Sequence, residues 1–489
     1  MTDAAPQVPE IPQVPATTES TSTPTASASK RPHIGLVAFY FPPSRASGVY
    51  RMLALANHLA RSGWDVTVFT VTTDFFEHIT MSSDETLLDD VDPRVRIERV
   101  PLPMHHLEQD IRRFGSFRGN HPELHRRVIK RAIRHVWGDQ YGSWIPGLLR
   151  RMLAIHKERP FDVTLATGNP YSTYQAVWML KKLKGVPYVL DSRDSFTLNL
   201  FTGEPAFPPG HAAFGIEKRT FADASAIAFV NQPLLRWHQE QYPGDADRMM
   251  VVANGYDPVS TGSATPKHTE PGLEPGEEME EPDERHAGAT PGVRFGYVGT
   301  LTANQPHRGV WAGWTRAKED AGDDPEFADA TAHLYGHLGF FGVSGAVRRT
   351  LPIDDPDSDV TWHGAVGKAE IGDAYAAIDA LLMIVADSPY VTSGKVFEYM
   401  STGKLVVGLY EADCAVADVL DDYPLLIKAA SLSEEDIAAA FREAVRRVPT
   451  VTAAEEEAAR EYAKRFERSV QLAPLQARLE RIAGTRPTS

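Results

Sequence analysis

A lysine near the C-terminal end of the chain has the type and position of a phosphate ligand. Lys395 lies in a run, 393–404, that follows the apolar strand expected at 381–385 and is predicted to be a loop opening a helix. The first amides of a helix have no acceptor within it, and the positive end of the helix dipole adds about half a unit charge beside the lysine. We therefore predict a phosphate site made by Lys395 and the backbone at Ser393, Gly394 and Val396.

A glutamate one turn further along the same helix predicts a sugar beside the phosphate. The carboxylate of Glu398 is able to accept hydrogen bonds from two hydroxyl groups, as the diol of a ribose requires. A diphosphate next to a sugar indicates a nucleotide. The alternative is that Lys395 and Glu398 are solvated side chains on the surface of an ordinary helix.

A second loop of similar design lies near the N-terminal end. A short apolar strand is expected at 34–39, a loop containing Gly48 follows it, and the helix expected from Val49 to Arg61 carries apolar residues on one face. The loop contains neither G-x-G-x-x-G nor G-x-x-x-x-G-K-[ST]. The pattern predicts the opening of a nucleotide-binding fold and argues against NAD enzymes and P-loop NTPases.

The composition is typical of a globular chain in a reducing compartment. Cys414 is the one cysteine among 489 residues, which excludes a disulfide framework and a cysteine zinc site. Residues 1–30 are rich in Pro, Ser, Thr and Ala and lack the pattern of a secretory signal, so we predict a disordered tail. No stretch of about 18 apolar residues occurs, and no membrane span is expected.

An acidic segment divides the chain into two halves. The net charge is −15, and eight carboxylates against one arginine lie between Glu270 and Arg285 among prolines and glycines. Such a segment is typical of a solvated linker. We expect a tail at 1–30, an N-terminal domain at 31–257, a disordered acidic linker at 258–292, a C-terminal domain at 293–452 and a C-terminal helix at 453–489.

Strands alternate with helices in both halves, which predicts an α/β fold of two Rossmann-like, doubly wound parallel sheets wrapped by helices. The expected strands are 34–39, 66–71, 95–100, 163–166, 187–191, 226–230 and 249–252, and then 294–298, 332–335, 359–363, 381–385, 405–408 and 425–427. Ligands of such sheets bind beyond the carboxyl ends of the strands. The loops after 34–39, 187–191, 294–298 and 381–385 are therefore expected to carry the chemistry, with the ligand between the two halves.

Several motifs, in a fixed order, resemble the GT-B glycosyltransferases of the large retaining family 4. They lie at 39–51, 59–68, 190–194, 254–257, 298–300 and 395–403, and the resemblance spans roughly residues 33–480. It implies an N-terminal acceptor domain facing a C-terminal nucleotide-sugar donor domain across a central cleft. It also implies that the C-terminal helix packs back across both domains, the alternative being a helix that binds a partner.

The resemblance further implies roles for individual residues. Gly48 would lie in the loop that approaches the donor phosphate or the acceptor. Gly299 and Thr300 would form the first loop of the donor domain, and Arg308 would be the basic residue that follows this loop.

Two positions depart from the family pattern. Tyr390 stands where the family often has a first glutamate, and Thr300 stands where an arginine is common. The missing glutamate removes the usual contact to the sugar 3-hydroxyl group. Members with a G-K-[LV]-x-E-Y pattern share this loss, so we do not interpret it as inactivation.

The activity implied by the resemblance is transfer of a sugar, with retention, from a nucleotide-diphosphate sugar to a hydroxyl acceptor in polysaccharide, glycolipid or other glycoconjugate biosynthesis. Lys395, Arg308 and the helix amides would stabilise the leaving diphosphate without a metal, and no cofactor is expected. The expected partners are the donor and a glycan, lipid-linked or small-molecule acceptor. The alternatives are a nucleotide-sugar epimerase of the same fold and a non-catalytic binding protein.

Asp194 is a candidate for ordering the acceptor or the sugar. It follows the strand expected at 187–191, where a side chain would look into the cleft. Equally, Arg193 and Asp194 would form a structural ion pair or cap the next helix, and Asp191 is expected to be structural. His363 ends a strand, and we interpret it as a hydrogen-bonded histidine of the fold rather than a catalytic one.

A basic region, 112–151, stands against the acidic background, with aromatic residues interleaved. Its cations are Arg112, Arg113, Arg118, Arg126, Arg127, Lys130, Arg131, Arg134, Arg150 and Arg151. Such a region would dock on anionic lipid, hold a lipid-diphosphate acceptor or serve a soluble acidic acceptor, or it is an ordinary surface helix. No nucleic-acid motif accompanies it. We expect a cytoplasmic protein that works peripherally at the inner membrane face.

Overall fold

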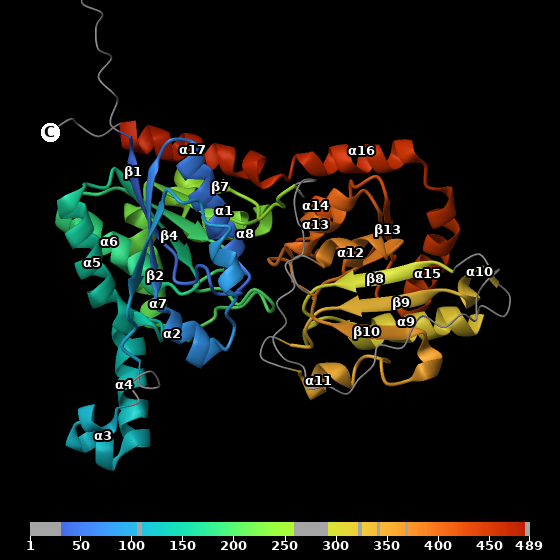
Figure 1. The fold of residues 1–489 in the computed structure, drawn as a ribbon, viewed down its shortest axis with the longest axis horizontal. Coiled ribbons are helices and arrows are strands. Elements are labelled where there is room, and N and C mark those ends of the chain that lie inside the picture. Colours follow the sequence, from blue (N-terminus) through green and yellow to red (C-terminus); the bar gives the residue numbers. More distant parts are fainter. Residues whose placement is uncertain are drawn as a thin grey trace, which may run out of the picture. The chain divides into compact units, whose positions relative to one another are not determined.

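The computed structural model describes residues 31–104, 110–258, 292–320, 325–339, 343–366, 370–386 and 388–484. The predicted tail 1–30 and nearly all of the predicted linker 258–292 lie outside these ranges. Each of the thirteen expected strands is present, and each begins and ends within two residues of its expected bounds. The predicted fold class is confirmed, because the strands form two parallel sheets (Figure 1).

The first sheet has seven strands in the order β3-β2-β1-β4-β5-β6-β7, all parallel. The strands are β1 (His33–Val37), β2 (Asp65–Val71), β3 (Val95–Val100), β4 (Val163–Gly168), β5 (Tyr188–Ser192), β6 (Ala226–Phe229) and β7 (Met249–Val251). The helices between them are α1 (Gly48–Arg61), α2 (Thr73–Phe75), α3 (Ser116–Asn120), α4 (Pro122–Trp137), α5 (Ile145–Glu158), α6 (Ser172–Lys184), α7 (Ala212–Asp223) and α8 (Gln232–Gln241).

The second sheet has six strands in the order β10-β9-β8-β11-β12-β13, again all parallel. The strands are β8 (Arg294–Val298), β9 (Thr331–Tyr335), β10 (Val360–Gly364), β11 (Ala380–Ile384), β12 (Leu405–Leu409) and β13 (Leu426–Lys428). The helices are α9 (His307–Glu319), α10 (Pro325–Ala328), α11 (Gly345–Arg348), α12 (Ile371–Ala376), α13 (Lys395–Thr402), α14 (Ala417–Leu420) and α15 (Glu434–Arg447).

Each sheet buries an apolar layer on both faces, because its central strands, such as β4, β5, β11 and β12, are buried along their whole length. The edge strands β3 and β10 differ, since they alternate buried with exposed or partly exposed residues. Helices α5 to α8 cover one face of the first sheet, and α1 covers the other. In the second sheet, α9 and α15 cover one face, while α13 and α14 cover the other. This arrangement brings the start of α1 and the start of α13 to the carboxyl ends of their sheets.

The C-terminal stretch, expected as one helix, forms two: α16 (Ala453–Lys464) and α17 (Arg468–Gly484). Ala459 and Ala463 of α16 pack into the core of the second sheet, whereas Leu472, Leu475 and Leu479 of α17 pack into that of the first. The break between the helices pairs with the chain that leaves the first sheet, since Tyr256 N–H donates to the Phe466 carbonyl at 3.1 Å.

A buried ion pair fixes α1 to the first sheet. Arg51 of α1 donates to the Asp191 carboxylate of β5 at 2.7 Å through Nη2, and both side chains are buried. Thr167 donates its hydroxyl to the same carboxylate at 2.9 Å, and Arg51 Nη1 donates to the Ala253 carbonyl at 3.0 Å. The expected structural role of Asp191 is confirmed.

Removing one partner of this pair leaves the other charge buried and unpaired, which is the costly case. We predict that Asp191→Ala lowers the free energy of unfolding by about 3–5 kcal/mol, measured by urea denaturation. The matched control is Glu457→Ala, which breaks the exposed pair between Arg460 and Glu457 and should cost less than about 1 kcal/mol. Equal small losses for both variants would contradict this account.

Candidate functional site

The start of α13 is held against the end of β8 by one buried hydroxyl group. The Tyr399 hydroxyl accepts from Val298 N–H at 2.8 Å and donates to the Val298 carbonyl at 3.2 Å. Tyr399 is fully buried, and burial raises the pKa of its hydroxyl well above the usual value, so it stays protonated and able to donate. The loop after β8 therefore lies directly beside the first turn of α13.

Gly299 and Lys395, which are predicted to share a site, are in contact. Gly299 has a φ of +154°, and a Cβ built on it would lie 2.9 Å from Lys395 Cε. The Lys395 side chain thus crosses the backbone of Gly299. It occupies the space that the side chain of any other residue at position 299 would need. Gly299 N–H donates to the Tyr335 carbonyl at 2.7 Å, which fixes the loop in this position. Glycine is required here both by conformation and by the close approach.

Glu398 is fixed by two donors on one of its oxygens. Lys395 Nζ lies 3.2 Å from Glu398 Oε2, and the Tyr375 hydroxyl donates to the same oxygen at 3.0 Å. Burial and the neighbouring carboxylate raise the pKa of Tyr375, so this hydroxyl keeps its proton. The lysine and glutamate are both part-exposed, at 29% and 40%. They present a cation and an oriented carboxylate acceptor to solvent at one place.

The backbone before α13 offers two open donors. Within the described residues, neither Ser393 N–H nor Gly394 N–H makes a hydrogen bond, and Gly394 is exposed. Val396 differs, because its N–H donates to the Ser393 carbonyl at 3.2 Å and its side chain is fully buried. Of the backbone positions predicted to face phosphate, Ser393 and Gly394 therefore remain open, and Val396 offers neither an unpaired amide nor an accessible side chain.

The first loop of the second sheet is ordered by a side-chain network. Gln305 Nε2 donates to the Tyr297 hydroxyl at 2.9 Å and to the Ile384 carbonyl at 2.7 Å. The Tyr297 hydroxyl donates to the Thr300 carbonyl at 3.1 Å. These bonds tie the loops after β8 and β11 together, and the two strands are neighbours at the point where the strand order reverses. This is where ligands of doubly wound sheets bind.

Arg308 lies in the first turn of α9, which follows that loop. Its side chain is exposed and has no ion-pair partner in the described part of the chain. An unpaired guanidinium is suited to an anionic ligand. Gly299 and Lys395 are in contact, but within the described residues Arg308 makes no hydrogen bond or ion pair with either of them, so its share in the same site stays a prediction.

On the first sheet, Gly48 is covered by Arg193. A Cβ at residue 48 would lie 1.8 Å from Arg193 Nη1. Arg193 donates through Nε to the Gly168 carbonyl at 2.9 Å and to the Thr167 hydroxyl at 3.1 Å. From the sequence, Arg193 was considered only as a partner of Asp194 or a helix cap. Its position over the start of α1 joins residues 145 positions apart and has no local sequence signal.

Strand order in the first sheet reverses between β1 and β4. The neighbour of β1 is β4, so the loop after β4, at Gly168 and Asn169, lies there, whereas the loop after β5 is one strand further out. The β5 loop still reaches the site, because Arg193 extends back over the β4 loop. The order of strands within a sheet carries no local sequence signal, so the loop after β4 was not among those expected to carry the chemistry. The expectation for the loop after 187–191 stays a prediction.

Asp194 is half-buried beside this arginine. Burial raises the pKa of its carboxyl group, the Arg193 charge opposes the rise and Asp191 adds to it. Arg193 directs its donors to the β4 loop, and no ion pair joins it to Asp194 in the described residues. The alternative of a structural Arg193–Asp194 pair is therefore not what the structure has, and the role of Asp194 toward a ligand stays a prediction.

Tyr390, which stands where the family has a glutamate, is turned toward the first sheet's core. Its half-buried ring packs against that core, and its carbonyl accepts from Asn231 Nδ2 at 2.8 Å. Asn231 also donates to the Thr392 hydroxyl at 3.1 Å, and Ser388 donates to the Leu200 carbonyl. The segment leading to Lys395 is thus attached to α8 and to the loop after β5, rather than free.

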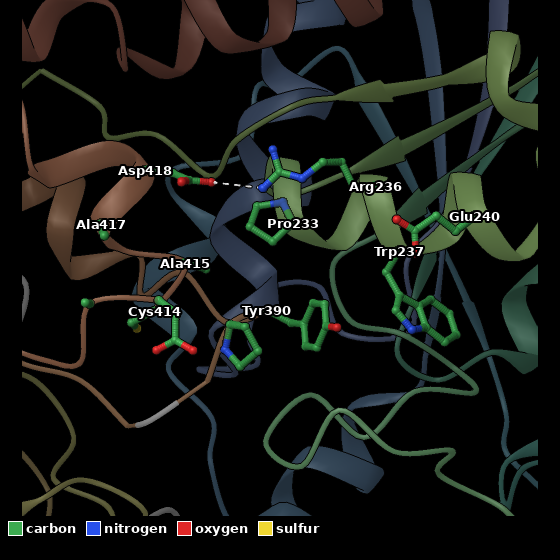
Figure 2. Close-up of a pocket in the computed structure, with 12 residues that line it drawn as sticks. Pro233, Arg236, Trp237, Glu240, Tyr390, Cys414, Ala415, Ala417 and Asp418 are labelled. Atoms are coloured by element: carbon green, nitrogen blue, oxygen red, sulfur yellow. Dashed lines mark ion pairs between the residues drawn. The ribbon is translucent and has the colours of Figure 1, made fainter.

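A cavity of about 400 Å³ lies between α8 and the residues around Tyr390 (Figure 2). Its lining is polar, with Arg236 and Glu240 on α8 and Asp418 on α14, and an ion pair of 3.9 Å joins Arg236 to Asp418. Apart from Tyr390, none of the residues singled out for the site lines it. The cavity is therefore separate from the contact between Gly299 and Lys395.

His363 pairs with another histidine. His363 Nε2 lies 3.0 Å from His333 Nδ1, and its ring stacks on that of Tyr335 with centroids 4.5 Å apart. Burial lowers the pKa of both, to about 4 for His333. The interpretation of His363 as a hydrogen-bonded histidine agrees with this geometry. Within the described residues, no three His, Cys, Asp or Glu side chains are arranged to hold a metal ion.

Comparison with known families finds one match. Residues 48–255 match the model of the glycosyl transferase 4-like domain. This range begins at the glycine covered by Arg193 and ends at Gly255, just after β7, the last strand of the first sheet. A search of curated protein sequences finds no significant match to the chain.

Comparison with solved structures finds the same two-sheet fold. A glycosyltransferase from Rickettsia africae is 12% identical, with a TM-score of 0.59, over 93% of this chain and all of that one. Sucrose-phosphate synthase from Thermosynechococcus elongatus is 14% identical with a TM-score of 0.53, over 92% and 100%. HepE from Anabaena, whose structure is a complex with UDP-glucose, is 13% identical with a TM-score of 0.53, over 93% and 98%.

Replacing Gly299 tests the contact on which the site depends. An added Cβ must displace the Lys395 side chain from its position, so we predict that Gly299→Ala weakens binding of a nucleoside diphosphate by about tenfold or more, the loss of one charge-assisted hydrogen bond. Calorimetric titration measures it. The control is Gly372→Ala in α12, where a Cβ would meet nothing within 4 Å. Binding as tight as that of the unchanged protein would refute the role of the contact.

Proposed function

The chain has the GT-B fold and contains a glycosyl transferase 4-like domain at 48–255, and from this premise we propose that it is a retaining glycosyltransferase. It moves a sugar from a nucleotide-diphosphate sugar to a hydroxyl group of an acceptor. The observation that carries the proposal is the contact of Lys395 with Gly299 beside the oriented Glu398 carboxylate. A cation, open backbone amides and a carboxylate that accepts hydrogen bonds from sugar hydroxyl groups lie at one place, and together they match a nucleoside diphosphate.

Charge develops on the leaving diphosphate as the glycosidic bond breaks. Lys395, the amides of Ser393 and Gly394, and Arg308 from α9 are the donors that we assign to this charge. A preorganised donor of this kind typically contributes about 10²–10³ in rate. We propose that these groups act without a metal ion, and that the leaving phosphate itself assists removal of the acceptor proton, as the resemblance to retaining members implies.

Glu398 is assigned to the ribose hydroxyl groups. Lys395 and Tyr375 occupy Oε2, and Oε1 remains for the ligand. Gly299 and Thr300, which begin the first donor loop, are assigned to border the diphosphate with their backbone. Because HepE is described in complex with UDP-glucose, a UDP-hexose is the first donor to test here.

The acceptor side is assigned to the first sheet. Gly48, Arg193 and Asp194 lie at the carboxyl ends of β1, β4 and β5. The Asp194 carboxylate has a raised pKa and no ion pair with Arg193, which suits it to accept a hydrogen bond from an acceptor hydroxyl. We propose acceptors of polysaccharide, glycolipid or glycoconjugate type, and a cytoplasmic site of action in keeping with a sequence that has one cysteine, Cys414, among its 489 residues.

The test is release of nucleoside diphosphate from UDP-glucose, GDP-mannose, ADP-glucose and dTDP-glucose, with and without oligosaccharide, glycolipid and monosaccharide acceptors. We predict release from one donor class that requires an acceptor. Lys395→Ala should lower the rate by about a hundredfold or more. The matched control is Arg316→Ala, which removes an exposed cation from the outer part of α9 and should leave the rate unchanged.

The alternatives give different outcomes in the same assay. Turnover of the donor without any acceptor would indicate an epimerase. Donor binding without release of a diphosphate, under every acceptor, would indicate a binding protein and overturn the proposal.

A further inference from the structure

Helix α4 carries two stripes of opposite character along its length. Leu124, Val128, Ala132 and Val136 follow one another at four-residue spacing and so lie on one side of the helix. Ile129 and Ile133 widen this apolar side. The cations Arg126, Lys130 and Arg134 form a second stripe at the same spacing, and Arg127 and Arg131 lie beside it.

The apolar side of α4 is exposed, whereas a helix of a globular core buries it. Leu124 is 50% exposed, Val128 49% and Val136 58%, and Ile129 is exposed as well. Phe117 of the neighbouring α3 adds a further exposed apolar side chain. A contiguous exposed apolar surface of this kind marks an interaction site.

The protein holds the C-terminal end of α4 and presents the rest of the helix outward. Gln175 Nε2 donates to the Trp137 carbonyl at 2.6 Å, and a Cβ on Gly138, which ends the helix, would lie 2.7 Å from the Ile216 side chain. From this anchor α4 extends away from the first sheet, with α3 at its far end (Figure 1). The exposed stripes thus belong to a projecting helix with a fixed base.

The cations of α4 are not neutralised within the described residues, apart from Arg126, which pairs with Glu123. Arg127, Lys130, Arg131 and Arg134 are all exposed and have no ion-pair partner there. This concentration of positive charge occurs in a chain whose net charge is −15. The positive charge therefore favours an anionic partner, and the apolar stripe beside it favours a partner that also has an apolar layer.

We propose that α4, with α3, is the surface by which this protein lies on an anionic lipid bilayer. An interfacial helix needs an apolar side that enters the acyl boundary and cations that stay at the headgroups, and α4 has both over its whole length. No helix among the described residues is long and apolar enough to cross a membrane. The contact is peripheral, and it does not depend on the donor site or on the proposed reaction.

The test is flotation of the full-length protein with vesicles of phosphatidylcholine, alone or mixed with phosphatidylglycerol. We predict binding to the mixed vesicles that falls as salt is raised. The variant Lys130→Gln/Arg131→Gln/Arg134→Gln should weaken it on the order of a hundredfold. Leu124→Ser/Val128→Ser/Val136→Ser, which changes only exposed positions, should also abolish it.

The matched control is Lys157→Gln/Lys184→Gln/Lys218→Gln, which removes the same charge from exposed positions on α5, α6 and α7 and should bind like the unchanged protein. Thermal unfolding confirms that each variant is folded. Equal loss in the control and the α4 variants would overturn the proposal, as would binding that neither α4 variant reduces. The proposal would also be overturned if the protein bound no vesicles and light scattering showed a dimer that both α4 variants dissociate. That result would assign the surface to a second copy of the chain.

Discussion

The attachment of α13 to the end of β8 through the Tyr399 hydroxyl is the constraint on which the donor site depends. The hydroxyl both donates to and accepts from Val298, so the register of the helix against the strand is fixed at the residue before Gly299. Lys395 can then cross the Gly299 backbone, and Glu398 can meet both Lys395 and Tyr375. A buried hydroxyl group lowers the stability of the fold if it lacks hydrogen-bond partners. When both partners are present, it fixes the position of the groups around it.

A corresponding constraint acts on the first sheet. The buried pair between Arg51 and Asp191 fixes α1 over β5 and reaches Ala253 near the end of the sheet. With α1 in this position, Arg193 has room to lie over Gly48 because that residue has no side chain. The segment from Ser388 to Thr392 is in turn bonded to Asn231 and Leu200. The segment that leads to Lys395 is therefore held in place by residues that follow strands of the first sheet.

The fold and the donor side of the candidate site were predictable from the sequence. Most strands are short apolar runs, and helices with clear periodicity separate them, so the strand bounds were predictable within two residues. Lys395 and Glu398 were predictable as neighbours from their spacing on one helix, and Gly299 from the family resemblance and its place at the carboxyl end of a strand. The sequence gives no local signal for Arg193 over Gly48, for Tyr375 at Glu398 or for β4 beside β1, since each joins segments distant along the chain. The basic character of α4 was evident from the sequence, but the exposure of its apolar stripe depends on the tertiary structure.

The most direct measurement of the central claim is calorimetric titration with UDP, GDP, ADP and dTDP, each compared with its nucleoside, on the unchanged protein and on Lys395→Ala. The account predicts that one diphosphate binds and that the variant weakens it roughly ten- to hundredfold, the value of a hydrogen bond to a charged group. It predicts little change for the nucleoside, which lacks the phosphates that Lys395 contacts. Equal affinity of both proteins for the diphosphate would contradict the account.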